Sequence, residues 1–409
     1  MTPRIPLAVT ALAVAVVALA GCVAKDAATT ADALTVTSDD NTCGVSAAGA
    51  SSGTLAFNVN NTGTQVTEFY LLASDGLRIV GEIENIAPGA TRTLTVTAQP
   101  GNYLTVCKPG MVGEGIGRAA FTVTGDQVAV TGADAQQKRQ QAVNLYAAFV
   151  KDQVEQLLPA AKTFTAAYAA GDDVTARAQF PQVRAFYERI EPVASTLGDL
   201  DPKIDYREVD AVAENLEWTG FHRIEKDLWV PAADALNADQ VTPAWQNWSP
   251  STPEQRAQLG ERLVADIGQL YDYVHSDDFQ AALDGQGIAA ISNGAISLLD
   301  EVATKKITGE EDWWSHTDLY DFAANVEGAK MSFSFVKDFA SATGAQGATL
   351  VERIQTGFAS LENELATHGS LSAGFVPYTD LTAADKRALV DQINTLAEPL
   401  SRLTGTILN

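Results

Sequence analysis

The chain is poor in histidine, in cysteine and in positive charge. Its 409 residues contain 4 His and 3 Cys, and 27 Lys and Arg stand against 51 Asp and Glu. No histidine precedes His222. This argues against an electron-transfer copper site in the first half of the chain, because such a site needs two imidazoles and a thiolate. The formal net charge of -24 disfavours nucleic acid and anionic membrane surfaces as partners and favours a cation as ligand.

Long apolar runs are absent after residues 7–20, which follow the positive charge of Arg4. This run is too short for a stable membrane span and predicts a secretory signal peptide. It ends in "LAGC", which resembles the bacterial lipobox, where the cysteine is lipidated and becomes the mature N-terminus. We therefore expect a signal peptide over residues 1–21, a lipid anchor on Cys22 outside the cytoplasm, and a tether over residues 22–32. Cleavage at another bond, without lipid, is the alternative.

The rest of the chain has two regions with different periods. Residues 33–130 contain seven short alternating runs separated by turn residues, which predicts a β-sandwich. The runs are "ALTVT", "TLAFNV", "TEFYLL", "LRIVGEI", "TRTLTVT", "NYLTVC" and "AAFTV". Residues 133–409 have the period of helices and predict an all-helical bundle. The expected fold class is therefore multidomain, a β-sandwich followed by an all-α bundle.

Within the bundle, one predicted helix runs from about Glu208 to Trp229 and carries the sequence "TGFHRIEKDLW". His222 and Glu225 stand at i and i+3 in it, so their side chains share a face as two metal ligands would. By itself such a pair is more often a packed histidine beside a surface glutamate. The zinc-protease pattern H-E-x-x-H is absent, because Lys226 stands four residues after His222.

A second helix places a carboxylate where the pattern requires an apolar side chain. Thr252, Pro253 and Gln255 predict its start as a capping box. Asp266 then falls on the apolar stripe of this helix. Because an unpaired buried carboxylate is costly, Asp266 should have a metal or another cation as partner, and a salt bridge between helices is the alternative.

Acidic residues also cluster in "KITGEEDWWSHTDLYDFAANVEG". Glu310 and Glu311 follow a glycine in a predicted loop and are free to point at a neighbouring site. Ser315 and Asp318 have the spacing of a capping box, which assigns Asp318 to the start of a helix. In the β region, Cys43 and Cys107 form a pair outside the cytoplasm, either as a disulfide or as thiolate ligands of a soft metal.

Several motifs in this order resemble the EfeO-type iron-uptake lipoproteins: "YERIEPVA", "DLDPKIDYRE", "EWTGFHRIEKDLW", "LVADI" and "KITGEEDWWSHTDLYDFAANVEGA". The resemblance implies an imelysin-like bundle over residues 133–409 and a cupredoxin-like sandwich over residues 33–130. It implies that Gly220, His222 and Glu225 form the family's G-x-H-x-x-E metal motif. The implied role is iron capture and delivery to a membrane permease, with a dye-decolorising-type haem peroxidase as a further partner.

The resemblance also implies metal binding in the sandwich, where Cys43, Glu68 and Cys107 are the matching positions. Copper or zinc would be the metal there. The lack of histidine disfavours a blue-copper centre. A disulfide between Cys43 and Cys107 and a Cys/Glu metal site both stay open at this point.

We therefore expect a lipid-anchored, non-enzymatic iron-binding protein. The expected ligands of Fe³⁺ or Fe²⁺ are His222, Glu225, Asp266 and one of Glu310 or Glu311, and protonation of the carboxylates should release the ion at low pH. The alternatives are a metallopeptidase of the imelysin type that uses the same residues, and a bundle that binds a protein partner or a polysaccharide.

Overall fold

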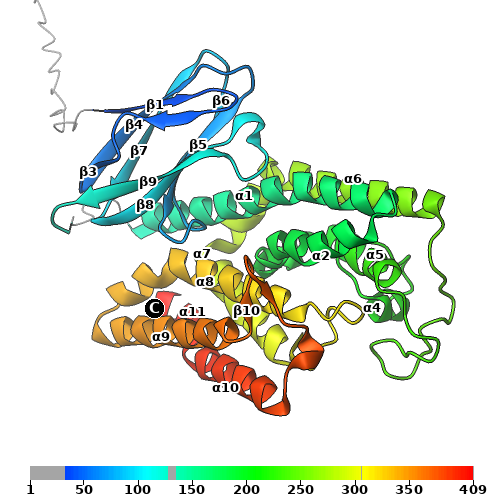
Figure 1. Ribbon diagram of the computed structural model, residues 1–409. Coiled ribbons are helices and arrows are strands. Elements are labelled where there is room, and N and C mark those ends of the chain that lie inside the picture. The colour runs from blue at the N-terminus through cyan, green and yellow to red at the C-terminus, as the bar shows by residue number, and fades with distance from the viewer. Residues whose placement is uncertain (1–32, 128–134, 305, 409) are drawn as a thin grey trace, which may run out of the picture.

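The computed structural model describes residues 33–127, 135–304 and 306–408, and it has two parts (Figure 1). Strands occupy Leu34–Thr124 and helices occupy Ala135–Leu408, which confirms the predicted fold class. The predicted signal peptide, Cys22 and the tether lie outside the described residues. Among the helices within those residues, none has the length and apolar character needed to cross a membrane.

The strand-rich part is a sandwich of two sheets. Their strand orders are β2-β1-β4-β7 and β3-β9-β8-β5-β6. The strands are β1 (Leu34–Ser38), β2 (Cys43–Val45), β3 (Gly49–Ser51), β4 (Gly53–Asn61), β5 (Thr67–Ala73), β6 (Ile79–Ile86), β7 (Thr91–Ala98), β8 (Gly101–Cys107) and β9 (Ile116–Thr124). The seven predicted runs correspond to β1 and β4 to β9. The prediction missed β2 and β3, which have three residues each and are too short to show alternation.

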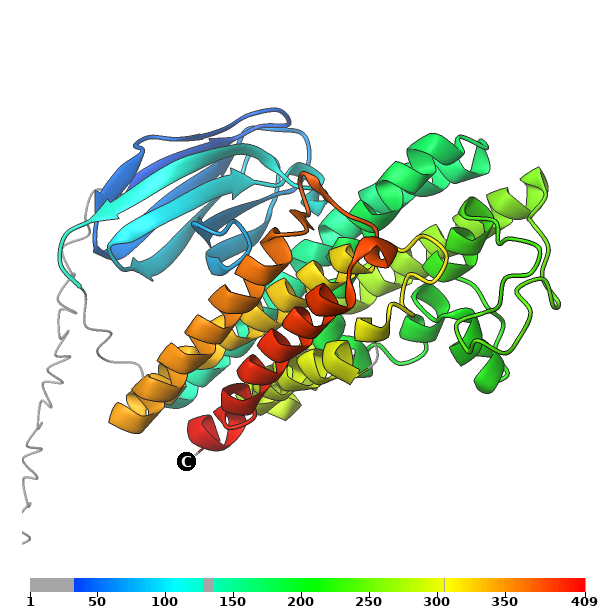
Figure 2. The ribbon, with the colours of Figure 1, turned by 60° about the horizontal axis from the view of Figure 1, so that its bottom comes forward.

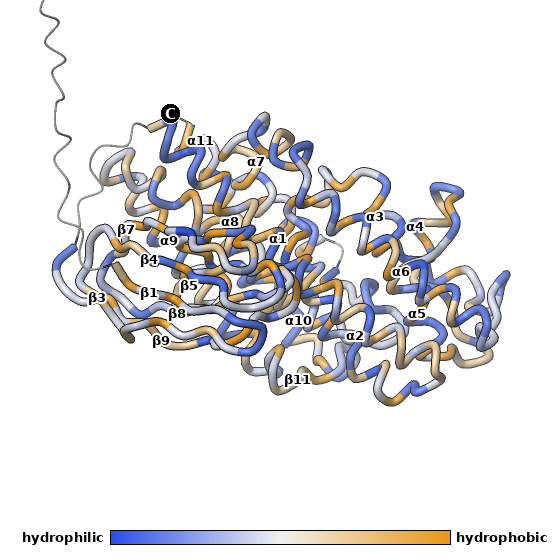
Figure 3. Tube along the Cα trace, turned by 90° about the horizontal axis from the view of Figure 1, so that it is seen from above, coloured by the Kyte–Doolittle hydropathy of each residue, from blue (hydrophilic) through white to orange (hydrophobic). Residues whose placement is uncertain are grey.

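The helical part is a bundle of long helices that lie side by side, and its longest helix, α1, packs against only some of them (Figure 2). Its helices are α1 (Ala135–Ala169), α2 (Asp173–Glu188), α3 (Leu200–Ile204), α4 (Glu208–Ala213), α5 (Phe221–Leu228), α6 (Pro253–Val274), α7 (Asp277–Thr304), α8 (Asp318–Ala342), α9 (Ala345–Ala366), α10 (Ala383–Leu400) and α11 (Leu403–Leu408). A two-stranded ribbon, β10 (Gly369–Ser370) with β11 (Gly374–Phe375), follows α9. The helices α3 to α5 lie at the end of the molecule away from the sandwich (Figure 3).

The capping box predicted at the start of α6 is confirmed, because the Thr252 hydroxyl accepts from the Gln255 N–H and the Gln255 side chain accepts from the Thr252 N–H. The single helix predicted from Glu208 to Trp229 is wrong. The chain forms α4 and α5 instead, with Asn215 (φ 56°) and Gly220 (φ 84°) in the left-handed region between them. A Cβ on Gly220 would lie 2.2 Å from the Ile204 carbonyl oxygen, so glycine is needed where α5 begins.

The two parts of the molecule share one buried interface. Strand β5 is buried on both faces, with Phe69 and Leu71 in the sandwich core and Tyr70 and Leu72 in the core formed with the helices. This is the alternation of side chains along a strand. The interface therefore continues the hydrophobic core from one part of the chain into the other.

A buried ion-pair group closes this interface. Lys108, after β8, is 1% exposed, and its Nζ lies 2.5 Å from both Asp152 Oδ1 and Glu155 Oε2 of α1. Glu155 Oε1 lies 3.0 Å from Nε2 of His275, which follows α6. Because each charge has a partner, the burial of this group is compensated, and the loss of one member would leave an unpaired buried charge.

Lys108→Met should lower the free energy of unfolding by about 3–5 kcal/mol, the usual cost of removing one partner from a buried pair. The matched control is Lys151→Met, which removes the more accessible bridge from α1 to Glu84, 3.2 Å long, and should cost about 1 kcal/mol or less. Urea unfolding at neutral pH measures both. Equal costs for the two variants would show that the Lys108 group does not hold the interface.

Candidate metal centre

His222 lies on α5, where burial and a carboxylate fix its ring. The side chain is 2% exposed, and its Nδ1 lies 3.0 Å from Glu225 Oε2. Its Nε2 is buried and has no hydrogen-bond partner. In the tautomer in which Nδ1 donates to an ionised Glu225, Nε2 presents its lone pair to the space beside it, which is the arrangement of a histidine that binds a metal.

Glu225 is held from its other side by the segment before α8. Its Oε1 accepts from the backbone N–H groups of Trp314 (3.0 Å) and Ser315 (2.8 Å) and from the Ser315 hydroxyl (2.8 Å). Burial raises the pKa of Glu225 to about 8, although these donors and Arg184 act against the rise. Both oxygens of Glu225 therefore have partners, and Oε2 contacts the His222 ring; Glu225 also forms a second possible metal-binding group with His222 and Asp312.

Two other carboxylates face the free nitrogen of His222. Asp205 Oδ1 lies 3.7 Å and Glu311 Oε1 lies 3.9 Å from His222 Nε2, and one ligand atom from each of the three residues lies within 4.8 Å of the others. These separations are too long for hydrogen bonds. They are close to those of ligands that share one ion, since metal–ligand bonds of about 2.0–2.2 Å place neighbouring ligand atoms about 3–3.5 Å apart.

The pKa shifts of the three residues differ in direction: burial raises the pKa of Asp205 well above its usual value, although Arg184 acts against the rise. Burial, with Arg184 nearby, lowers the pKa of His222 well below its usual value, so the imidazole is neutral. Burial also acts to raise the pKa of Glu311, but Lys306 and other cations hold it at about 2. One neutral imidazole nitrogen and carboxylate oxygens form a donor set that iron, zinc and manganese accept. The residues present therefore fit a metal ion.

Behind this site lies a buried charge cluster centred on two cations. The Arg184 guanidinium on α2 is fully buried and pairs with Glu188, Asp205 and Asp321. Lys306 Nζ lies 2.8 Å from Glu188 and 2.9 Å from Glu191. Buried carboxyl groups outnumber these two cations. They are Glu188, Asp205, Glu225, Glu311, Asp312, Asp318 and Asp321. Burial raises the pKa of Asp205, Asp312, Asp321 and Glu225, so protons neutralise part of this excess, and binding of a cation there would release protons.

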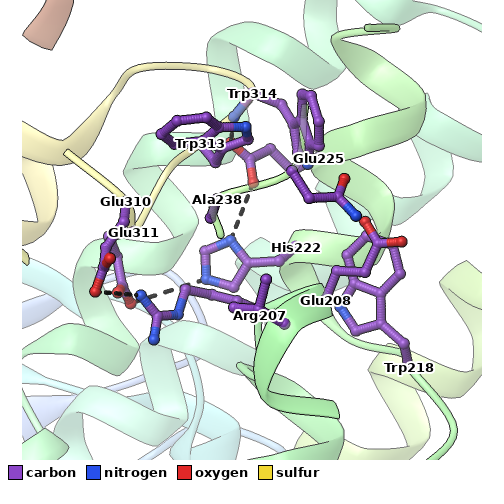
Figure 4. Close-up of a pocket in the computed structure, with 12 residues that line it drawn as sticks. Arg207, Glu208, Trp218, His222, Glu225, Ala238, Glu310, Glu311, Trp313 and Trp314 are labelled. Carbon is purple, nitrogen blue, oxygen red and sulfur yellow. Dashed lines mark hydrogen bonds and ion pairs between the residues drawn. The ribbon is translucent and has the colours of Figure 1, made fainter. Parts of the chain in front are cut away.

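A cavity of about 20 Å³ adjoins His222 (Figure 4). Its lining includes His222, Glu225, Glu310, Glu311, Arg207, Trp218, Trp313 and Trp314. A volume of this size holds about one water molecule or one ion. The enclosed space beside His222 therefore has the size of a single ion.

His222, Glu225, Glu310 and Glu311 line the same cavity, and Asp266 is not among its lining residues. Asp266 lies on α6, 5% exposed, where Gln269 Nε2 lies 3.2 Å from Oδ1 and Arg262 Nε lies 3.9 Å from Oδ2. The stripe correctly indicated burial. It gave no information on which buried group would lie beside it.

Asp205 and Asp312 also lie at the site, and the sequence interpretation missed both. Asp205 follows the buried Ile204 at the end of α3, so a carboxylate directly after an apolar helix end was the available signal. The predicted capping box at Ser315 is wrong. The N-cap of helix α8 is Thr317, which makes no side-chain capping hydrogen bond, and the Ser315 hydroxyl donates to Glu225 instead. Asp318 is fully buried, and its Oδ1 accepts from the Asp312 N–H.

In the sandwich, Cys43 and Cys107 form a disulfide between β2 and β8, which joins the two sheets. Glu68 lies on the other face of its sheet. Cys107 pairs in register with Phe69, so the side chain of Glu68, one residue before Phe69, points the opposite way, toward the helices. The combined site of Cys43, Glu68 and Cys107 is therefore not formed, because the sulfurs are bonded to each other and Glu68 faces elsewhere.

Comparisons with known proteins agree with both parts of the structure. The family model described as a cupredoxin-like domain matches residues 11–116, and the model described as imelysin matches residues 142–403. The iron uptake system component EfeO of Escherichia coli K12 is 33% identical over 375 residues, 91% of this chain and 90% of that protein. This chain belongs to the EfeO family. The EfeO of Shigella flexneri matches with the same identity and coverage.

Among solved structures, the EfeO-family chain is similar to an iron-regulated protein A precursor from Parabacteroides distasonis. The TM-score is 0.48 at 17% identity, and the match covers 68% of this chain and 97% of that one. The assignment to the EfeO family confirms the resemblance seen in the sequence motifs. It rests on the family models and on the EfeO relatives.

Glu68→Gln tests whether the surroundings of Glu68 destabilise its ionised form. Burial and then Glu155 raise the pKa of Glu68 well above its usual value, while Lys108 acts against the rise. A raised folded-state pKa means that stability is present in full below about pH 4.5 and falls as pH rises. The glutamine variant should therefore unfold at a higher temperature than wild type at pH 8, and at a similar temperature near pH 4.

Thermal unfolding across this pH range measures the effect. Glu114→Gln, which removes a charge from an exposed position of the same domain, is the control and should follow the wild-type profile. A lower unfolding temperature for Glu68→Gln at pH 8 would contradict this account and would indicate that the ionised carboxylate is stabilising.

Proposed function

We propose that the protein binds one iron ion, Fe³⁺ or Fe²⁺, outside the cytoplasm and delivers it to a membrane permease. The observation that carries this proposal is the buried, unpartnered Nε2 of His222, which faces two carboxylates beside an ion-sized cavity. The proposed ligands are His222, Asp205 and Glu311. Glu225 orients the imidazole. The relatives named above support iron as the ion, since each is named an iron uptake system component.

A bound cation best explains why Nε2 of His222 has no hydrogen-bond partner. A buried nitrogen without a hydrogen bond costs about 1–3 kcal/mol, and this cost is unexplained if the residues only form salt bridges. Two buried cations hold the surrounding carboxylates: Arg184 pairs with Asp205 and lies 3.6 Å from Glu311, and Lys306 lies 3.4 Å from Glu311. The geometry is therefore preserved without the ion, as a binding site that loads and unloads repeatedly requires.

The proposed partners and location go beyond what the family assignment states. A lipid anchor on Cys22 would keep the protein at the outer side of the cell membrane, near a permease that accepts the ion. A dye-decolorising-type haem peroxidase is proposed as a further component of the system. The excess of acidic residues is consistent with a cation as cargo.

Peptidase activity has little support from the site. The sequence has no second histidine four residues from His222, and the enclosed space beside His222 has the size of an ion. The iron- or zinc-loaded protein should therefore release no more peptide from casein than the His222→Ala variant does. Hydrolysis that wild type performs and His222→Ala does not would assign the site to an enzyme.

Iron titration of the purified protein tests the proposal. Wild type should bind one ion at the site, and His222→Ala should lose it, because the only imidazole beside the carboxylates is gone. His368→Ala is the matched control, since His368 follows α9 and does not line the cavity, and it should bind as wild type does. Unchanged stoichiometry and affinity in His222→Ala would refute the assignment.

A second comparison separates the ligand set proposed here from the set expected from the sequence. Asp205→Asn should weaken iron binding by about tenfold to a hundredfold, because a carboxylate ligand becomes an amide. Asp266→Asn should leave the affinity within about twofold of wild type. Isothermal titration gives both affinities, and circular dichroism checks that each variant is folded. A large loss of iron affinity in Asp266→Asn alone would support the ligand set expected from the sequence.

A further inference from the structure

An ion pair stands at the opening of the His222 cavity. Arg207, just before α4, places Nη1 2.9 Å from Glu310 Oε1, and both side chains are partly accessible at 17% and 30%. In Figure 4 the Arg207 side chain extends beside His222 toward Glu310 and Glu311. The pair therefore lies between the solvent and the proposed ligands.

Arg207 has a second partner that holds it in place. Its Nε lies 2.7 Å from Asp210 Oδ2, and its Nη2 lies 3.2 Å from Asp210 Oδ1. A guanidinium bound at two nitrogens by one carboxylate has a fixed orientation. The contact with Glu310 uses a different nitrogen, so it can break while the contacts with Asp210 persist.

Glu310 is far less restrained than the residue that follows it. Glu311 is 9% accessible at its side chain and lies near Lys306 and His222, whereas Arg207 is the ion-pair partner found for Glu310 among the described residues. The preceding Gly309 has φ 78° and lies against the Tyr378 ring, which fixes the turn before the two glutamates. Glu311 therefore belongs to the interior, and Glu310, the residue before it, lies at the opening.

We propose that Glu310 is the receiving ligand of the site and that Arg207 is its exchangeable counter-ion. An incoming ion takes Arg207's place on the Glu310 carboxylate and then passes to His222, Asp205 and Glu311. Arg207 stays on Asp210 during this exchange. This inference rests on the proposed function and adds the route by which the ion enters the site.

The ion pair at the opening should affect the rate at which the ion binds, whereas the proposed ligands should determine whether it stays bound. Glu310 should affect how fast the ion binds, and Arg207 should oppose binding, because it competes for Glu310 and carries a positive charge at the opening. Since a partly exposed ion pair adds little to stability, loss of this pair should leave unfolding almost unchanged. A merely structural role would give no change in binding rate.

The test is stopped-flow mixing of the metal-free protein with Fe²⁺ alone, without oxygen, at several Fe²⁺ concentrations. Fluorescence of the tryptophans that line the cavity reports binding. Glu310→Gln should lower the association rate constant by about tenfold, and Arg207→Gln should raise it several-fold, with one ion bound in each variant. Glu217→Gln, an equal charge change at a residue that pairs with Arg262 and does not line the cavity, should change the rate by less than about twofold.

Each other outcome is decisive. Equal rates for Glu310→Gln and Glu217→Gln would overturn the role of Glu310 and leave the proposed iron site intact. Loss of the bound ion in Glu310→Gln would make Glu310 a holding ligand and overturn the inference. Unchanged or slower association in Arg207→Gln would overturn the role of Arg207. If wild type binds no Fe²⁺ and no Fe³⁺, the proposed function fails, and this inference fails with it.

Discussion

The Arg184 guanidinium, fully buried among carboxylates, is the interaction on which the helical part depends. It pairs with Glu188 on its own helix α2, with Asp205 after α3 and with Asp321 on α8. A buried charge is tolerated only when its partners are present and well oriented. The segments that contribute these partners are therefore held in fixed positions, and they include one that supplies a proposed metal ligand.

The same cluster explains why the site can stay open without an ion. Arg184 contacts both Asp205 and Glu311, Lys306 also contacts Glu311, and the segment before α8 holds Glu225 and thereby His222. The oxygens that face Nε2, Asp205 Oδ1 and Glu311 Oε1, also contact these cations, and they make no hydrogen bond to the imidazole. A site prepared in this way needs little rearrangement when it binds, and it suits exchange of an ion better than permanent storage.

The sandwich and the bundle are joined by different means. Tyr70 and Leu72 extend the apolar core across the interface, and Lys108 closes it with two carboxylates of α1. Lys108 directly follows Cys107, whose disulfide joins the two sheets. The covalent link and the ion pairs are therefore adjacent along the chain. The interface lies far from α5, so the proposed iron site is built by the helical part alone (Figure 1).

The sequence by itself determined the two-part fold, the seven longer strands, the start of α6 at Thr252 and the pairing of His222 with Glu225, because each is written in a local period or spacing. Only the tertiary structure decided the rest. Asp266 is buried as its stripe indicates, but its neighbours come from the packing of other segments. Asp205 joins His222, and Cys43 joins Cys107, across separations that no local pattern encodes. Whether a buried carboxylate binds metal depends on what faces it, and that is fixed by long-range contacts.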